Sequence, residues 1–161
     1  MYWLGLDPGV SGGIAILDEY HMLKAWKMPE TERDISDVFE SLRKLVTFAI
    51  IESVHAFKGQ GVSSTFTFGR NYGFLRGMLI AHKIPFEEVT PGKWQAYMGI
   101  KSIKDEKKAA HKNRLKGMAQ RLFPTLKITL ATADAILIAE YLYRREMKHE
   151  VAKRQVSGEG R

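Results

Sequence analysis

Three short apolar runs fill the first 28 residues, and this feature restricts the possible folds most. They cover residues 2–7, 12–18 and 21–28, with an Asp-Pro-Gly turn after the first run and an Asp-Glu-Tyr connection after the second. Connections this short predict an antiparallel meander of three strands. Apolar residues at helical spacing then predict an amphipathic helix over 34–46, followed by a fourth, apolar strand over 48–53. Because a crossover helix joins parallel strands, the sheet is expected to be mixed.

The rest of the chain predicts mainly helices. We expect a long helix over 64–83, a short strand over 85–89, and three more helices at 91–99, in a lysine-rich segment ending at Phe123-Pro124, and over 132–147. This order predicts an α/β, ribonuclease-H-like fold, in which helices cover both faces of a five-stranded mixed sheet. We expect a single domain over residues 1–149 and a flexible polar tail over 150–161.

Composition and charge narrow the class of function. The chain has no cysteine, so disulfides, thiolate metal sites and cysteine nucleophiles are excluded. No apolar run approaches the ~20 residues that span a bilayer, and no basic region opens the chain, so we expect an intracellular protein without a membrane partner. Residues 101–121 carry eight Lys or Arg and two Asp or Glu, which accounts for +6 of the net charge of +7. Such a segment indicates either a polyanion-binding surface or a solvated helix face.

Three acidic side chains are placed so that they could lie close together in the fold. Asp7 ends the first predicted strand, Glu52 ends the fourth, and Asp134 lies in the first turn of an apolar helix. If the two strands are parallel neighbours, their final carboxylates lie roughly 5 Å apart. Like charges this close favour a shared cation, and oxygen ligands suit Mg²⁺ or Mn²⁺. Each acid also has a simpler interpretation, as a turn former, a solvated strand end or a favourable first-turn charge.

The ordered motifs of the chain resemble those of RuvC-type Holliday junction resolvases, also called crossover junction endodeoxyribonucleases. The resemblance covers about residues 2 to 145. Within the family, the chain looks most like the small phage or bacterial members. It rests on five segments, of which GQGVSS with FGRNYG is the most specific: GLDPGVSGGIAIL, IIESVHAFKGQGVSSTFTFGRNYGFLRGML, VTPGKWQAYMGI, RLFP and ADAILIAEY.

The resemblance implies a structure-selective nuclease that hydrolyses four-way junctions or other branched DNA. The carried-over metal ligands are Asp7, Glu52 and Asp134, and they would hold two Mg²⁺ ions per active site, with Mn²⁺ as a possible substitute. One departure is clear. The family has a further acid three or four residues before the last one, where this chain has Ala131 and Leu130. The sequence does not show whether this departure is natural or introduced.

The resemblance also implies partners and DNA contacts. Members of the family act as homodimers through the long helix after the second acid, here at about 64–83. In this helix we expect the contacts to come from Phe68, Tyr72, Leu75 and Leu79, with a repeat of glycines every four residues that allows close approach: Gly69, Gly73 and Gly77. A loop aromatic residue probes the junction centre, and the nearest equivalents are His55 and Phe57, with Lys58 beside them. The lysines expected to meet phosphates are Lys101, Lys104, Lys107, Lys108 and Lys112.

Two other functions compete with a resolvase. A branched-DNA-binding protein with weak or no catalytic activity is supported by the missing acid at Ala131 or Leu130. An actin-like or sugar-kinase-like ATPase shares the early acid-glycine turn, but the chain is too short for two lobes and has no second phosphate loop.

Overall fold

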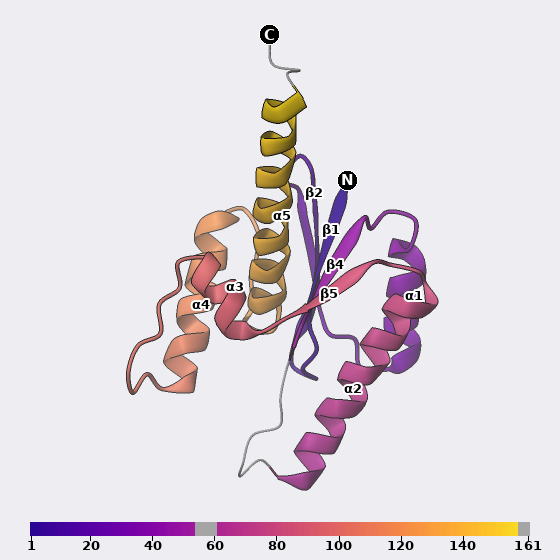
Figure 1. The fold of residues 1–161 in the computed structure, drawn as a ribbon. Helices are drawn as coiled ribbons and strands as arrows, with labels where there is room; N and C mark the ends of the chain where they lie inside the picture. Colours follow the sequence, from indigo (N-terminus) through magenta and orange to yellow (C-terminus); the bar gives the residue numbers. More distant parts are fainter. Residues whose placement is uncertain (54–60, 158–161) are drawn as a thin grey trace.

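The computed structural model describes residues 1–53 and 61–157, and it contains one five-stranded mixed sheet with the order β3-β2-β1-β4-β5 (Figure 1). The strands are β1 (Tyr2–Asp7), β2 (Gly13–Asp18), β3 (Leu23–Lys27), β4 (Phe48–Glu52) and β5 (Phe86–Val89). β1 pairs antiparallel with β2 and parallel with β4, while β3 and β5 form the two edges. The predicted meander, crossover and five-stranded mixed sheet are therefore confirmed.

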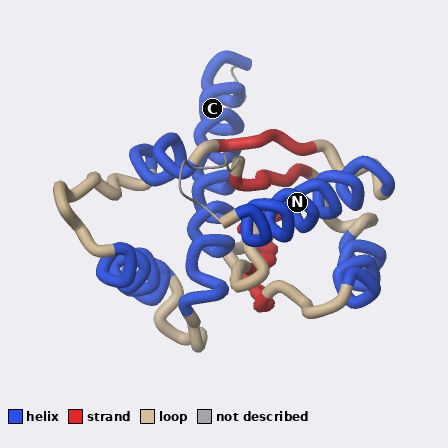
Figure 2. The backbone as a smooth tube through the Cα atoms, turned by 90° about the horizontal axis from the view of Figure 1, so that it is seen from below, coloured by secondary structure: helices blue, strands red, loops and turns tan. Residues whose placement is uncertain are grey.

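Helices cover both faces of the sheet, as Figure 2 shows from below. They are α1 (Glu32–Leu42), α2 (Val62–Ala81), α3 (Pro91–Tyr97), α4 (Lys108–Leu122) and α5 (Leu130–Ser157). Apolar side chains from α3, α4 and α5 form one core with the sheet, and those from α1 and α2 form a second core on its other face. Strand residues contribute alternately to the two cores: Trp3 and Ile50 belong to the first, and Leu4 and Ile51 to the second.

The strand register brings two acids to one end of the sheet. Leu6 of β1 lies opposite Ile51 of β4 in a parallel pair, so Asp7 and Glu52 are the next residues along two neighbouring strands. Both strands are buried and apolar up to these acids.

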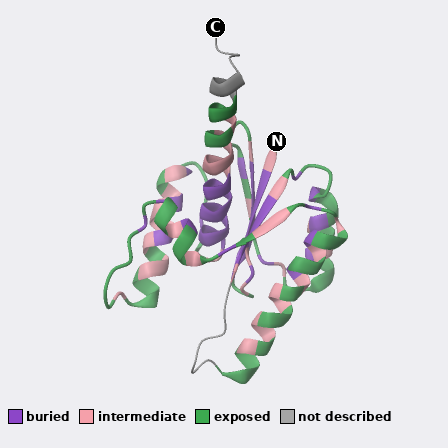
Figure 3. Ribbon diagram, in the orientation of Figure 1, coloured by how far each residue is buried: buried purple, intermediate pink, exposed green. Residues whose placement is uncertain are grey.

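At two glycines, the backbone of α5 approaches the backbone of the sheet directly. A methyl group at Gly5 of β1 would overlap the backbone of Ala135 and Ala139, so only glycine permits this contact. Gly13 of β2 is similar, because a Cβ there would lie 2.7 Å from the carbonyl oxygen of Ala131. The first half of α5 is accordingly buried, whereas residues 148–149 and 151–153, farther along the helix, are exposed (Figure 3).

Several helix boundaries differ from the sequence-based expectation. α1 begins earlier because the Thr31 side chain accepts a hydrogen bond from the backbone N–H of Asp34 and caps it. α2 begins at Val62, two residues before the expected start at 64, with Gly61 at its N-cap and no side-chain cap. α5 continues to Ser157 through Glu, Ala, Lys, Arg and Gln, all good helix formers, so much of the expected tail from 150 is helical. Within the described residues, no helix is long and apolar enough to cross a lipid bilayer.

Candidate active site

Asp7 and Glu52 are held in place by different contacts. The N–H of Gly9 donates to Oδ1 of Asp7 at 3.3 Å, inside the turn that follows β1. Glu52 is buried, and its Oε1 accepts a hydrogen bond of 2.8 Å from Nε1 of Trp94 in α3. The side-chain amide of Asn71 in α2 donates to the carbonyl of Pro8, which ties this turn to the opposite layer. The turn after Asp7 is thus fixed from within and from α2.

Asp134 enters the same region from α5. The helix begins at Leu130, and its first turn contains no acid, so Asp134 lies one turn later than the sequence suggested. Its side chain is only 6% exposed, and its Oδ2 accepts a hydrogen bond from the ammonium group of Lys112 in α4. Its other oxygen, Oδ1, is buried and has no hydrogen-bond partner among the described residues. A buried carboxylate oxygen without a partner is unfavourable, and a cation could stabilise it.

The charges of the carboxylates and of Lys112 affect the pKa values of Asp7, Glu52 and Lys112. Burial raises the pKa of Asp7, and the negative charge of Asp134 raises it further. Burial also raises the pKa of Glu52 to about 7, and the charge of Asp7 adds to that effect. Lys112 is half-buried, which opposes its charging, but the three carboxylates outweigh this and raise its pKa. The three acids and Lys112 therefore form one electrostatic unit.

The donor set fits a divalent ion chemically. It offers carboxylate oxygens only, and it includes the unpartnered Oδ1 of Asp134. Among the described residues, however, no three acidic or histidine side chains are placed close enough together to hold a metal ion. The ammonium of Lys112 lies on Asp134 instead. Binding an ion would require these side chains to move closer together.

The missing acid is not replaced from elsewhere in α5. Leu130 is exposed and Ala131 is partly exposed at the start of the helix. Glu140 is buried away from the site, where its two oxygens contact Nε2 of His21 at 2.7 Å and Nε of Arg144 at 2.6 Å. Glu140 therefore belongs to a separate cluster with His21 and Arg144 and does not replace the missing acid.

The predicted DNA-contacting residues fall into three groups. His55, Phe57 and Lys58 lie outside the described residues. Lys112 is placed in the carboxylate unit and not at the open surface. The other four lysines are exposed on the loop before α4 and at its start, and none has a carboxylate within 4.0 Å among the residues described: Lys101, Lys104, Lys107 and Lys108.

Sequence reasoning missed two contacts of this region. Trp94 follows the proline and glycine that open α3, and nothing local indicated that its indole would reach Glu52. Lys112 was identified only as a phosphate ligand, because its pairing with Asp134 depends on how α4 packs against α5.

Two solved structures of RuvC from Thermus thermophilus are similar to this chain. The first is a complex with a Holliday junction substrate; it has a TM-score of 0.63 and 14% identity, and the alignment covers 91% of this chain and 96% of that one. The second, RuvC alone, has a TM-score of 0.58 and 15% identity, with 92% and 97% covered. No protein-family model and no curated protein matches the chain. The likeness shows that the chain has a RuvC-like, ribonuclease-H-like fold.

Proposed function

We propose that this chain is a divalent-metal-dependent endonuclease that cleaves four-way junctions or other branched DNA. The RuvC-like fold supports a nuclease of this kind. The observation that carries the proposal is the electrostatic unit of Asp7, Glu52 and Asp134 at one end of the sheet, with one buried carboxylate oxygen unpartnered. A DNA substrate of this kind implies a site of action inside a cell.

Asp7, Glu52 and Asp134 are the residues that would hold Mg²⁺, or Mn²⁺ in its place. When bound, two such ions would activate water and stabilise the charge that develops at the phosphodiester. The protein's own part is positioning: Trp94 orients Glu52 through Oε1 and leaves Oε2 for a ligand. Lys112 partly neutralises the three carboxylates and so keeps them together in the ion-free chain.

The free lysines before α4 are proposed to contact DNA phosphates. Their ammonium groups are exposed and have no described acidic partner, so contacts to DNA need not break existing ion pairs. Phosphate contacts position a duplex without reading its sequence, which suits recognition of a branched shape.

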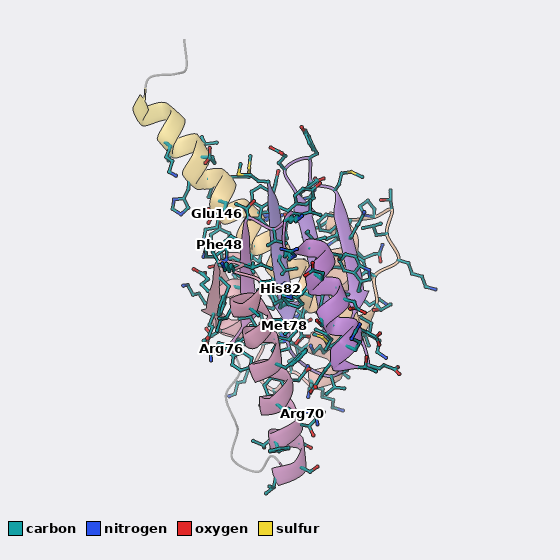
Figure 4. All side chains as sticks on the ribbon, turned by 90° about the vertical axis from the view of Figure 1, so that its right-hand side faces the viewer. Phe48, Arg70, Arg76, Met78, His82 and Glu146 are labelled. Atoms are coloured by element: carbon teal, nitrogen blue, oxygen red, sulfur yellow. The ribbon has the colours of Figure 1, made fainter. Side chains whose placement is uncertain are left out.

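A homodimer through α2 completes the proposal. The sequence pointed to Phe68, Tyr72, Leu75 and Leu79 as the apolar contacts, but Leu75 and Leu79 are buried in the chain's own core. Tyr72 is partly buried, and its hydroxyl donates to Glu88 at 2.6 Å. The exposed face of α2 is a different stripe (Figure 4 shows this helix from the side, with Arg70, Arg76 and Met78 labelled).

That stripe has the composition of a close helix contact. Val62, Phe66 and Ile80 are 88%, 71% and 64% exposed. Between them the stripe contains the glycines of the repeat, and a Cβ at any of these would meet nothing within 4 Å: Gly69, Gly73 and Gly77. A twofold pair of chains would place two active sites on a substrate with two strands to cut. Phe66→Asp should therefore give a monomer by light scattering, whereas Thr65→Asp, one position away, should leave a dimer.

A junction-binding protein without catalysis is the second candidate. It is favoured by the apolar residues where the family's further acid is expected, and by the ammonium of Lys112 on Asp134. This candidate keeps the fold, the lysines and the dimer but not the ion.

A cleavage assay on a four-way junction separates the two candidates. Mg²⁺ and Mn²⁺ are titrated against the chain and against Asp7→Asn, Glu52→Gln and Asp134→Asn, with gel-shift binding measured in parallel. We expect the chain to cut and each variant to lose cleavage while keeping junction binding, because DNA affinity comes mainly from lysines. Asp37→Asn, at an exposed position of α1, is the matched control. Binding without cleavage at every ion concentration would establish the second candidate.

A further inference from the structure

A groove of about 350 Å³ runs along β3, at the edge of the sheet. One wall is β3 itself, and the other is the segment 126–128 that leads into α5. Thr132 and Ile136 of α5 also line it, together with Ile128, which is buried in the adjacent core. The groove is separate from the carboxylate unit and from the exposed stripe of α2.

The outer backbone of β3 is unpaired. Met28 N–H donates to the carbonyl of Gly12 at 2.9 Å, and Asp18 N–H donates to that of Met22 at 3.1 Å, which defines the hydrogen-bonded pairs with β2. The backbone groups of the even-numbered residues of β3 therefore point toward β2. Those of the odd-numbered residues, Leu23, Ala25 and Lys27, point outward. None of these groups has a partner among the described residues. An open edge of this kind can accept another extended chain.

The side chains along the groove combine apolar surface with positive charge. Leu126 is 37% exposed on the wall opposite β3, and Trp26, 36% exposed, lies on the far face of β3 beside its partner Ile14. Lys24 lies on β3 and Lys127 on the opposite wall, and within the described part of the chain neither has a carboxylate within 4.0 Å. Leu23 and Ala25 face the same core as Ile128, whereas Lys24 pairs with Ile16 of the other core and so lies on the opposite face of the sheet. A strand added at this edge would therefore meet Lys127 on the face of the slot and Lys24 on the other face.

We propose that this groove binds an extended acidic peptide segment of another protein, which adds to β3 as a sixth strand. The open N–H and C=O groups would pair with the peptide backbone, and an aliphatic side chain would enter the slot beside Ile128 and Ile136. Flanking carboxylates would pair with Lys24 and Lys127. The partner is identified by this chemistry: alternating acidic and aliphatic residues in an extended conformation.

Two other occupants fit the groove less well. DNA could contact the two lysines, but it offers nothing that repeats the backbone pairing of a strand edge. A second copy could offer its other edge, β5, but the carboxylates there are already engaged. Glu87 pairs with Arg145, and Glu88 pairs with Arg76 at 2.8 Å. Because Glu87 and Glu88 of the β5 edge are engaged in these ion pairs, the basic β3 edge favours a different protein as its partner.

The proposal is tested with a fluorescein-labelled peptide that alternates Asp and Val over about eight residues. Anisotropy measures its affinity for the full chain, and hydrogen exchange follows the amides of Leu23, Ala25 and Lys27. We expect saturable binding and slower exchange at these three amides, whereas Lys24 and Trp26, already paired with β2, should change little. The same peptide with N-methyl groups on alternate residues should not bind, because it cannot pair with the edge.

Two variants locate the site. Ala25→Pro removes only an outward N–H, so it should preserve the β2–β3 ladder and block strand addition. The double variant Lys24→Glu/Lys127→Glu should lower the affinity by about tenfold or more through charge reversal. Lys44→Glu/Lys148→Glu, with the same charge change on exposed residues elsewhere, should leave it unchanged. Melting curves check folding, and if Ala25→Pro is unfolded, the double variant and the N-methyl peptide decide.

Three results would overturn the proposal. The first is no saturable binding up to about 1 mM, a range that already includes weak interactions; the edge lysines would then serve only to discourage aggregation. The second is equal binding of the N-methyl peptide, which would exclude strand addition. The third is loss of junction-DNA affinity in the double variant without loss of peptide binding, which would assign the groove to DNA.

Discussion

Replacing Glu52 by Gln should stabilise the ion-free chain at alkaline pH while abolishing cleavage. Gln keeps an oxygen that can accept the hydrogen bond from Trp94, so the substitution removes a charge and preserves the shape. Burial first, and then the charge of Asp7, raise the pKa of Glu52 from 4.5 to about 7. In the unfolded chain the carboxyl returns to its ordinary pKa.

The sign follows from proton binding. Between pH 4.5 and about 7 the folded chain holds a proton on Glu52 that the unfolded chain has lost, so stability falls as the pH rises through this window. At about 1.4 kcal/mol per pKa unit, the loss attributable to Glu52 is roughly 3.5 kcal/mol by pH 8. The Gln variant lacks this loss. At pH 8 it should be more stable than the parent chain by up to that amount, and at pH 4.5 nearly equal to it.

Urea unfolding in EDTA at half-unit intervals from pH 4.5 to 8 measures the difference. Glu30→Gln, at a position 88% exposed, is the control and should follow the parent curve. Adding Mg²⁺ at pH 8 should stabilise the parent more than the Gln variant, because only the parent has the full set of ligands. If the parent and the Gln variant lose stability in parallel with pH, Glu52 does not titrate as a buried acid, and the electrostatic argument for the site fails.

Three further predictions concern the site and its supports. Ala131→Asp should lower the Mg²⁺ concentration needed for half-maximal cleavage, or start cleavage if the parent is inactive, because another carboxylate strengthens ion binding; Leu130→Asp tests the alternative position, and no change in either would show that the start of α5 does not face the ions. Gly5→Ala should destabilise the fold by about 1–3 kcal/mol in urea unfolding, because the new methyl group overlaps backbone atoms of α5; an unchanged midpoint would contradict the close contact. Changing the four free lysines together to alanine should reduce the slope of log affinity against log salt by roughly two to three units, since each neutralised phosphate contributes about 0.9; an unchanged slope, with a collapsed one in a chain truncated after Lys148, would move the footprint to the end of α5. The four are Lys101, Lys104, Lys107 and Lys108.

The sheet and the positions of two acids could be predicted because they follow from local patterns. Short apolar runs with tight connections define the meander, and a helix between two strands requires parallel pairing. Once β1 and β4 are parallel neighbours, Asp7 and Glu52 must lie at the same end. These steps use only neighbouring residues and a rule of chain connectivity.

The contacts between layers could not be predicted in the same way. The pairing of Lys112 with Asp134 and of Trp94 with Glu52 depends on where two helices settle on the sheet. The apolar side of α2 posed a related problem. Leu75 and Leu79 satisfy the helical period because they pack inside this chain, and periodicity does not distinguish an internal face from an interface with another copy.

The contact between Gly5 and α5 has a consequence for how the protein tolerates change. In most helix–sheet pairs the spacing is set by the thickness of the side chains between them, so it shifts whenever the core repacks. Here backbone meets backbone at Gly5, and Asp134 lies one residue before Ala135 in that contact. The separation between β1 and the start of α5 is therefore insulated from substitutions among the surrounding Leu, Ile and Val residues. Many residues of this core could therefore be substituted during evolution while the carboxylates of Asp7 and Asp134 kept their relative positions.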